Sequence, residues 1–181
     1  MKAIVQRVMQ ASVTVGDELV SSIGKGLCVL VGISRKDTPN DIDWLVRKIL
    51  NLRIFEDENG KRWSKSVVDR QGEILCVSQF TLMVTLKGNK PDYHEAMSPD
   101  EAPQFYEEFM KKLRAAYISD KVKDGKFGAY MQVNIQNDGP VTIPLESPIF
   151  NQNNKKQLGN TKPEAAAVGD KTDTDNTNAS S

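Results

Sequence analysis

Two apolar runs constrain the fold of this chain more than any other feature. They read GKGLCVLVGIS at residues 24–34 and GEILCVSQFTL at residues 72–82. A continuous apolar run bounded by glycine is typical of a β-strand that is buried on both of its faces. The first run therefore predicts such a strand, and the second predicts a further, strongly apolar strand.

Two other segments have the spacing of amphipathic helices. The first is predicted to begin at Thr38, because proline follows at the first helical position and apolar residues then recur on one face. The second is predicted to begin at Ser98, which forms a capping box with Glu101 around Pro99. Its apolar stripe predicts packing against a core, and consists of Phe105, Tyr106, Phe109, Met110, Leu113 and Ala116.

The remaining patterned segments predict strands. They are residues 2–10 and 11–24, with a turn near Gly16, and then NLRIF at 51–55, FGAYMQVNIQ at 127–136 and VTIPLE at 141–146. The predicted fold class is α+β, with a mostly antiparallel, barrel-like sheet and two packed helices. From Asn151 onward the sequence has no aromatic residue and only scattered aliphatic ones. We therefore expect a folded domain over residues 1–149 and a disordered polar tail over residues 150–181.

Composition and the amino-terminal sequence bear on the cellular location of the protein. No run approaches the roughly 20 apolar residues that a membrane helix needs, and the start MKAIVQRV lacks the features of a signal peptide. Cys28 and Cys76 lie inside apolar strands, which favours buried thiols over a disulfide or a metal site. We therefore expect a cytoplasmic protein.

The charge balance bears on nucleic-acid binding. The 24 basic and 24 acidic residues cancel, which argues against a surface that binds nucleic acid everywhere. Two alternatives remain: a local basic patch that binds nucleic acid, or a solvated face whose lysines are balanced by nearby carboxylates. The basic residues that would form the patch are Lys87, Lys90, Lys111, Lys112, Arg114, Lys121, Lys123 and Lys126.

Familiar catalytic motifs are absent from the sequence, which contains no GxSxG, P-loop or HExxH pattern. The single histidine, His94, is either a general base or a surface residue without a catalytic task. Polar side chains follow the second apolar run at Ser78, Gln79 and Thr81. Backbone N–H groups at such a strand end can bind a developing oxyanion, or neighbouring backbone can satisfy these polar groups instead.

The stretch QNDGPVTI at residues 136–143 interrupts a segment that alternates like a strand. Asn, Asp, Gly and Pro together are typical of a turn. The alternative is a cis peptide between Gly139 and Pro140, whose carbonyl groups would line a pocket wall.

Two motifs, SQFTL at 78–82 and NDGPVT at 137–142, stand in this order in the chain. Together with LKGNKPDYHEAM, KFGAYMQV and AIVQRVMQASVTV they resemble the D-aminoacyl-tRNA deacylase family in its eukaryotic cytosolic form, from Met1 to about Pro148. The resemblance implies the deacylase fold and a homodimer with active sites at the subunit interface. It implies hydrolysis of the ester between a D-amino acid and the 3′ end of tRNA, with glycyl-tRNA as a second substrate. It implies no metal, organic cofactor or membrane.

The resemblance also assigns residues. It implies catalytic roles for Ser78, Gln79, Phe80 and Thr81, and a chirality filter at Gly139 and Pro140 that reaches into the partner's site. Thr81 is either a nucleophile or a positioning residue, and we favour positioning because a threonine nucleophile needs an activating base. The pocket for the adenosine and substrate is expected to contain Phe127, Gly128, Ala129, Met131, Asn137 and Thr142.

Three other functions stay open at this level. The domain could bind nucleic acid or a replication complex, with the tail as a regulated arm. It could be a relaxed relative that clears mischarged L-aminoacyl-tRNA. It could also be a structural dimer without turnover.

Overall fold

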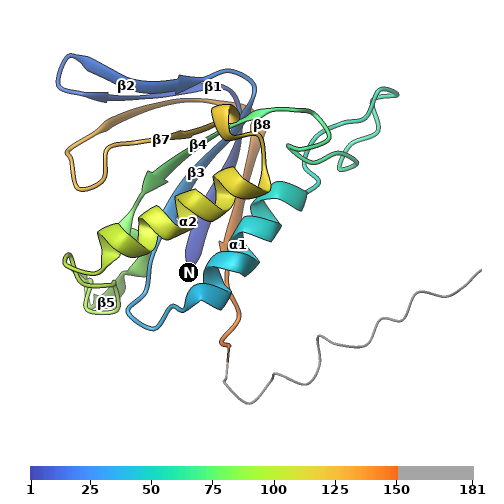
Figure 1. Ribbon diagram of the computed structural model, residues 1–181. Helices are drawn as coiled ribbons and strands as arrows, with labels where there is room; N and C mark the ends of the chain where they lie inside the picture. The colour runs from blue at the N-terminus through green and yellow to red at the C-terminus, as the bar shows by residue number, and fades with distance from the viewer. Residues whose placement is uncertain (151–181) are drawn as a thin grey trace, which may run out of the picture. The chain divides into compact units, whose positions relative to one another are not determined.

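The two apolar runs form neighbouring parallel strands inside a mixed sheet, as Figure 1 shows. The computed structural model describes residues 1–150, which make up one compact unit. The predicted tail lies outside the described residues, apart from its first position. No helix among residues 1–150 is long and apolar enough to cross a membrane.

The elements follow one another along the chain, and the longest connection, residues 52–72, lies between α1 and β4. They are β1 (Lys2–Val15), β2 (Glu18–Ile23), β3 (Gly26–Gly32), α1 (Pro39–Asn51), β4 (Glu73–Ser78), the 3-10 helix η1 (Phe80–Met83), β5 (Thr85–Lys87), β6 (Lys90–Asp92), α2 (Ala102–Ala116), the 3-10 helix η2 (Ser119–Lys121), β7 (Val122–Asp124) and β8 (Gln132–Glu146).

The main sheet has the strand order β2-β1-β3-β4-β7, and β8 pairs with β1. The β1 strand pairs antiparallel with β2, β3 and β8, whereas β4 pairs parallel with both β3 and β7. Parallel neighbours need a crossover connection, and α1 and α2 supply the two crossovers. The α+β prediction with a mostly antiparallel sheet is confirmed: three of the five strand pairings in the main sheet are antiparallel and two are parallel.

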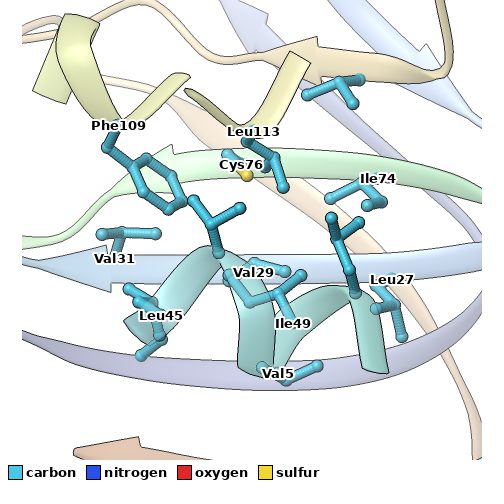
Figure 2. Close-up of a cluster of buried hydrophobic side chains, with 14 of the residues drawn as sticks. Val5, Leu27, Val29, Val31, Leu45, Ile49, Ile74, Cys76, Phe109 and Leu113 are labelled. Atoms are coloured by element: carbon cyan, nitrogen blue, oxygen red, sulfur yellow. The ribbon is translucent and has the colours of Figure 1, made fainter. Parts of the chain in front are cut away.

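Alternation along the strands builds two cores, one on each face of the sheet. Figure 2 shows Leu27, Val29 and Val31 of β3 in one cluster with Leu45 of α1 and Phe109 of α2. The intervening residue Cys28 and the β4 residues Leu75 and Val77 face a second cluster, which β2 and β8 help to cover. Both cysteines are buried free thiols, as predicted. Each face of β3 and β4 is therefore covered, which explains their apolar sequences.

The two helices lie side by side on one face of the sheet (Figure 1). The predicted start of α1 is confirmed, because the Asp41 carboxylate accepts hydrogen bonds from the Thr38 backbone N–H at 2.8 Å and hydroxyl at 2.9 Å. The predicted start of α2 at Ser98 is wrong. The Ser98–Glu101 pair exists, but it closes a turn, and the helix begins at Ala102.

Three predicted strands also differ from the structure. Residues 51–55 are not a strand, and only Phe55 makes an isolated bridge, to Lys65. The strand of the second apolar run ends at Ser78, and η1 follows. Residues 127–131 precede β8, which then continues without a break from Gln132 to Glu146. The turn interpretation of residues 136–143 is therefore wrong, because both halves of β8 pair with the same strand, β1.

Candidate active site

The predicted catalytic residues lie where β4 ends. The Gln79 backbone N–H donates to the Val31 carbonyl at 2.7 Å, which holds the chain against β3 for one residue beyond the strand. The Gln79 side-chain amide then donates to the Thr81 hydroxyl oxygen at 2.5 Å. The first hydrogen bond of η1 runs from the Leu82 N–H to the Gln79 carbonyl at 3.2 Å. The N–H groups of Phe80 and Thr81 therefore have no hydrogen-bond partner inside this 3-10 helix.

Phe80 presents an exposed ring at this site. Its side chain is 59% exposed and meets the Tyr93 ring edge-on, with centroids 5.1 Å apart. Close to Tyr93 in sequence, the ring nitrogens of His94 lie 2.8 Å from Asp92 and 3.2 Å from Glu95. His94 is thus held by two carboxylates on the surface, and no hydrogen bond or ion pair within residues 1–150 joins it to Thr81. This arrangement favours the surface-residue hypothesis for His94.

The Phe127 segment reaches the same edge of the sheet from the end of β7. The Gly125 N–H donates to the Cys76 carbonyl at 2.9 Å, so the chain leaves β7 beside the end of β4. Phe127 packs on Tyr106 of α2 with centroids 5.4 Å apart, and Gly128 takes a left-handed φ of 73°. The carboxyl ends of the parallel strands β4 and β7 therefore place the SQFTL motif and the Phe127 segment of the predicted pocket at the same edge of the sheet.

A partly buried acid, Asp124, supports the Phe127 ring through Tyr106, and the sequence analysis missed it. The Tyr106 hydroxyl donates to the Asp124 carboxylate at 2.8 Å. Burial raises the pKa of the Asp124 carboxyl, although the bond from Tyr106 opposes that rise. Burial also raises the pKa of Tyr106 well above its usual value. The pair fixes the ring on which Phe127 rests.

Gly139 and Pro140 lie in an excursion of β8. Thr142 pairs with Gln6 and Asn137 pairs with Val8, so residues 138–141 stand opposite the single residue Arg7. The Asn137 side-chain amide donates to the Thr142 hydroxyl oxygen at 3.0 Å across the base of the excursion. The Gly139–Pro140 peptide is cis, as the alternative to a turn had proposed. Asn137 and Thr142 thus lie beside the Gly139–Pro140 excursion rather than with Phe127.

Arg7 holds this excursion in place; it lies inside the segment AIVQRVMQASVTV, but the sequence analysis gave it no role. Its guanidinium forms an ion pair with Asp138 at 3.0 Å and donates to the Ile54 carbonyl at 2.6 Å. A Cβ added to Gly139 would lie 2.9 Å from the Arg7 guanidinium and would require a φ of +116°. Only glycine fits this position without a shift of its neighbours.

The two groups of motif residues do not meet within one chain. Ser78 of β4 pairs with Val31 of β3, which in turn pairs with Ala3 of β1. The excursion of β8 lies opposite Arg7 of β1. Four residues along β1 correspond to about 14 Å, and the three strand spacings from β8 to β4 add about 14 Å sideways. The Gly139–Pro140 excursion and the SQFTL motif are therefore about 20 Å apart in one protomer.

The predicted basic patch is partly neutralised. Lys87 pairs with Asp92, and Lys112 pairs with Asp43 at 2.7 Å and with Glu108 at 3.7 Å. Lys121 donates to the Gln71 carbonyl at 2.5 Å. These contacts support the alternative of a charge-balanced face for part of the patch.

Comparison with known proteins agrees with this architecture. A family model described as D-Tyr-tRNA(Tyr) deacylase matches residues 4–146. D-aminoacyl-tRNA deacylase 1 of Bos taurus is 67% identical over 148 residues, covering 82% of this chain and 71% of that protein. D-aminoacyl-tRNA deacylase of Drosophila melanogaster is 65% identical over 148 residues, covering 82% of this chain and 93% of that protein.

Two solved structures share the fold. That of the c-Myc DNA unwinding element binding protein has a TM-score of 0.80 at 66% identity, and covers 82% of this chain and 100% of that chain. A probable eukaryotic D-amino acid tRNA deacylase has a TM-score of 0.68 at 19% identity over 80% of this chain and 97% of that chain, which is a likeness of fold alone. The match across residues 4–146 and the relatives at 65–67% identity show that this chain belongs to the D-Tyr-tRNA(Tyr) deacylase family.

Proposed function

We propose that this chain hydrolyses the ester between a D-amino acid and the terminal adenosine of tRNA, and that two copies of the chain build each active site. The relatives' names supply the activity. The observation that supports the shared site is the separation of about 20 Å between the Ser78–Thr81 motif and the Gly139–Pro140 excursion. Only a second copy can bring an excursion of this kind next to Thr81.

Two features of β8 support pairing with a second copy. β8 has one neighbour among the described strands, β1, although it is 15 residues long. A long unpaired edge invites contact with another chain. In addition, the buried Asn137 amide oxygen, beside the filter, has no hydrogen-bond partner within residues 1–150. A partner subunit or its substrate would satisfy that acceptor.

The chemistry at the β4 end is hydrolysis by water. The free N–H groups of Phe80 and Thr81 are the donors that we assign to the ester carbonyl oxygen, where negative charge develops. The water oxygen bonds to the ester carbon, the bond to the ribose oxygen breaks, and that oxygen leaves with a proton. The products are a free amino acid and tRNA.

Thr81 acts here as a positioning residue. The Gln79 amide group donates to its hydroxyl oxygen, and an amide cannot take the proton that a threonine nucleophile must lose. The role of activating the water falls to the neighbouring 2′-hydroxyl of the terminal ribose. Phe127, stiffened by Tyr106 and flanked by Gly128, offers an aromatic face to the adenine base.

The filter excludes the L isomer without making specific contacts with the side chain of the amino acid. Backbone carbonyl groups of the Gly139–Pro140 pair accept hydrogen bonds from the substrate ammonium and occupy the space that an L side chain needs. Glycine has no side chain to exclude, so glycyl-tRNA is a second substrate of this site. We place the enzyme in the cytoplasm, with residues 1–149 as the catalytic domain and residues 150–181 as a separate tail.

A paired assay tests the proposal. Purified protein is incubated with D-tyrosyl-tRNA and with L-tyrosyl-tRNA at the same enzyme concentration, and ester loss is followed for both. Loss of the D ester alone is expected. Loss of both esters would retain the hydrolase but remove the filter, as in a relative that clears L-aminoacyl-tRNA.

Binding to duplex nucleic acid is the second candidate function. The specific observation in its favour is the solved structure at 66% identity, which carries the name of a DNA unwinding element binding protein. Against it stand the net charge of zero and the ion-paired lysines. Loss of neither ester in the paired assay, together with salt-dependent binding of duplex DNA, would favour this second function.

A further inference from the structure

Tyr130 presents its aromatic ring to solvent in the connection between β7 and β8. It is 88% exposed, more than any other aromatic residue among residues 1–150. An aromatic side chain of this size normally gains from burial in a folded chain. Exposed rings beside a proposed RNA site are typical of the platforms on which single-stranded bases stack.

The turn before Tyr130 is well ordered. The Ala129 N–H donates to the Lys126 carbonyl at 3.1 Å, and Gly128 at the third position of this turn has a φ of 73°. A positive φ at that position is characteristic of a type II turn, and glycine adopts it without strain. The Lys126 N–H also donates to the Met131 sulfur at 3.3 Å. Contacts on both sides of Tyr130 therefore fix the place from which its ring projects.

Tyr130 lies near the ring that we assign to the terminal adenine. Phe127, which packs on Tyr106, precedes Tyr130 by three residues, and three residues span at most about 11 Å. The nucleotide joined to the terminal adenosine is therefore within reach of Tyr130 when the adenine lies on Phe127. A Cβ added to Gly128 would meet no atom within 4 Å among residues 1–150, so a base can approach the turn from that side.

Lys126 supplies positive charge at the same turn. It is exposed and has no ion-pair partner among residues 1–150, in contrast to Lys87 and Lys112, which pair with carboxylates. The acid closest to it in sequence, Asp124, is partly buried and accepts a hydrogen bond from Tyr106. An unpaired ammonium group beside two aromatic rings matches single-stranded RNA, which offers phosphates and bases in alternation.

We propose that Tyr130 and Lys126 form a second nucleotide subsite. The base of the cytidine that precedes the terminal adenosine stacks on the Tyr130 ring, and the Lys126 ammonium contacts the phosphate between the two nucleotides. The inference rests on the proposed function, in which Phe127 receives the terminal adenine. Stacking tolerates any base, so the subsite adds affinity without selecting one tRNA.

The test uses three short substrates and single-residue variants. The substrates are the D-tyrosyl esters of adenosine, of the dinucleotide CpA, and of the same dinucleotide with an abasic first nucleotide. The kcat/KM for each is measured with wild type, Tyr130→Ala, Tyr130→Phe and Ile118→Ala. Ile118 is the matched control, because it is 48% exposed and precedes β7, whereas Phe127 follows β7.

Tyr130 should matter only when the second base is present. We expect Tyr130→Ala to lower kcat/KM for the CpA ester about 5- to 10-fold, mainly through KM, and to change the adenosine ester less than about 2-fold. Tyr130→Phe keeps the stacking face and most of the activity, and Ile118→Ala matches wild type. The abasic ester should lose the same factor with wild type, and Tyr130→Ala should then cause no further loss.

Lys126 has a separate readout. The CpA ester carries one phosphate and the adenosine ester carries none, so salt should raise KM for the CpA ester alone. Lys126→Ala should flatten that salt dependence and leave the adenosine ester unchanged. An unchanged salt dependence would remove Lys126 from the subsite.

The other outcomes overturn the inference. Equal losses on the CpA and adenosine esters would mean that Tyr130 acts through the Phe127 turn or the subunit interface, and no loss would make it a surface residue without a role. A wild type that hydrolyses none of the esters removes the proposed function as well. A wild type that hydrolyses the adenosine and CpA esters equally removes this subsite alone. Thermal unfolding checks each variant, and the abasic ester tests stacking on wild-type protein if Tyr130→Ala unfolds.

Discussion

At the scale of single residues, glycine at position 139 is required for two separable reasons. Its φ of +116° suits only glycine, and an added Cβ would lie 2.9 Å from both Arg7 and Val141. The first reason affects the stability of the chain. The second displaces the Arg7 guanidinium, which holds the excursion through Asp138. A substitution at this position therefore combines an effect on the fold with an effect on the site.

We predict that Gly139→Ala lowers kcat/KM for D-tyrosyl-tRNA by about 100-fold, because a shift of about 1 Å in a positioning group has effects of this size. It should also lower the free energy of unfolding by about 1–2 kcal/mol. Gly16→Ala is the matched control, since Gly16 has a φ of +59° and no atom within 4 Å of its added Cβ. That variant should lose stability alone. Full activity of Gly139→Ala would remove the filter from our account.

The sequence identified the residues that resemble known motifs and missed those that support them. Ser78, Gln79 and Gly139 were named from two short motifs, and the structure places them at a strand end and in an excursion. Arg7 and Asp124 were not named, because nothing local marks them. Arg7 contacts Asp138, and Asp124 contacts Tyr106. In both pairs the two residues lie far apart in the sequence. Only the folded chain brings such partners together.

At the scale of elements, the start of α1 depends on one carboxylate. Burial raises the pKa of Asp41, but hydrogen bonds from Ser147 and Thr38 outweigh burial and set the pKa below its ordinary value of 3.8. The Ser147 hydroxyl donates at 2.5 Å, so Asp41 also ties the helix to the residue that follows β8. A carboxyl whose pKa is lowered by folding stabilises the folded state above its unfolded pKa.

We predict that Asp41→Asn lowers the free energy of unfolding at pH 7 by about 1–2 kcal/mol, the usual cost of a lost helix cap. The difference from wild type should shrink as the pH falls below 3.8, because wild-type Asp41 then becomes protonated. Urea unfolding at pH 7 and pH 3 measures both values. Asp43→Asn is the control, because its exposed pair with Lys112 contributes little. A pH-independent difference would contradict the assigned role of the charge.

Element boundaries show where sequence patterns stop being informative. Thr38 and Pro39 begin a helix as predicted, whereas the similar signal at Ser98 and Glu101 closes a separate turn before α2. A capping box is a local arrangement of hydrogen bonds, and a single turn satisfies it as well as a helix does. The continuity of β8 through Gly139 was also missed. Pairing with β1 on both sides of the excursion outweighs the local preference for a turn.

At the scale of the whole molecule, the fold class followed from patterning, whereas the distance between motifs did not. Periodicity and the two apolar runs predicted a sheet with two packed helices. Strand register decides which residues of neighbouring strands lie opposite one another. The register of β1 with β3 and with β8 sets the distance between Ser78 and Gly139. That separation turns the expected homodimer into a requirement of the proposed site.

A shared site makes a prediction that no single-chain site can meet. Gln79→Ala removes the amide that orders Thr81, and Gly139→Ala disturbs the excursion, so each homodimer alone should be nearly inactive. In a heterodimer of the two variants, one site combines both defects and the other combines an intact Gln79 with an intact Gly139. Mixing after unfolding and refolding should therefore restore about a quarter of wild-type activity, since half of the randomly assorted dimers carry one good site of two. If both motifs acted within one chain, every chain in the mixture would keep one defect and the mixture would stay inactive.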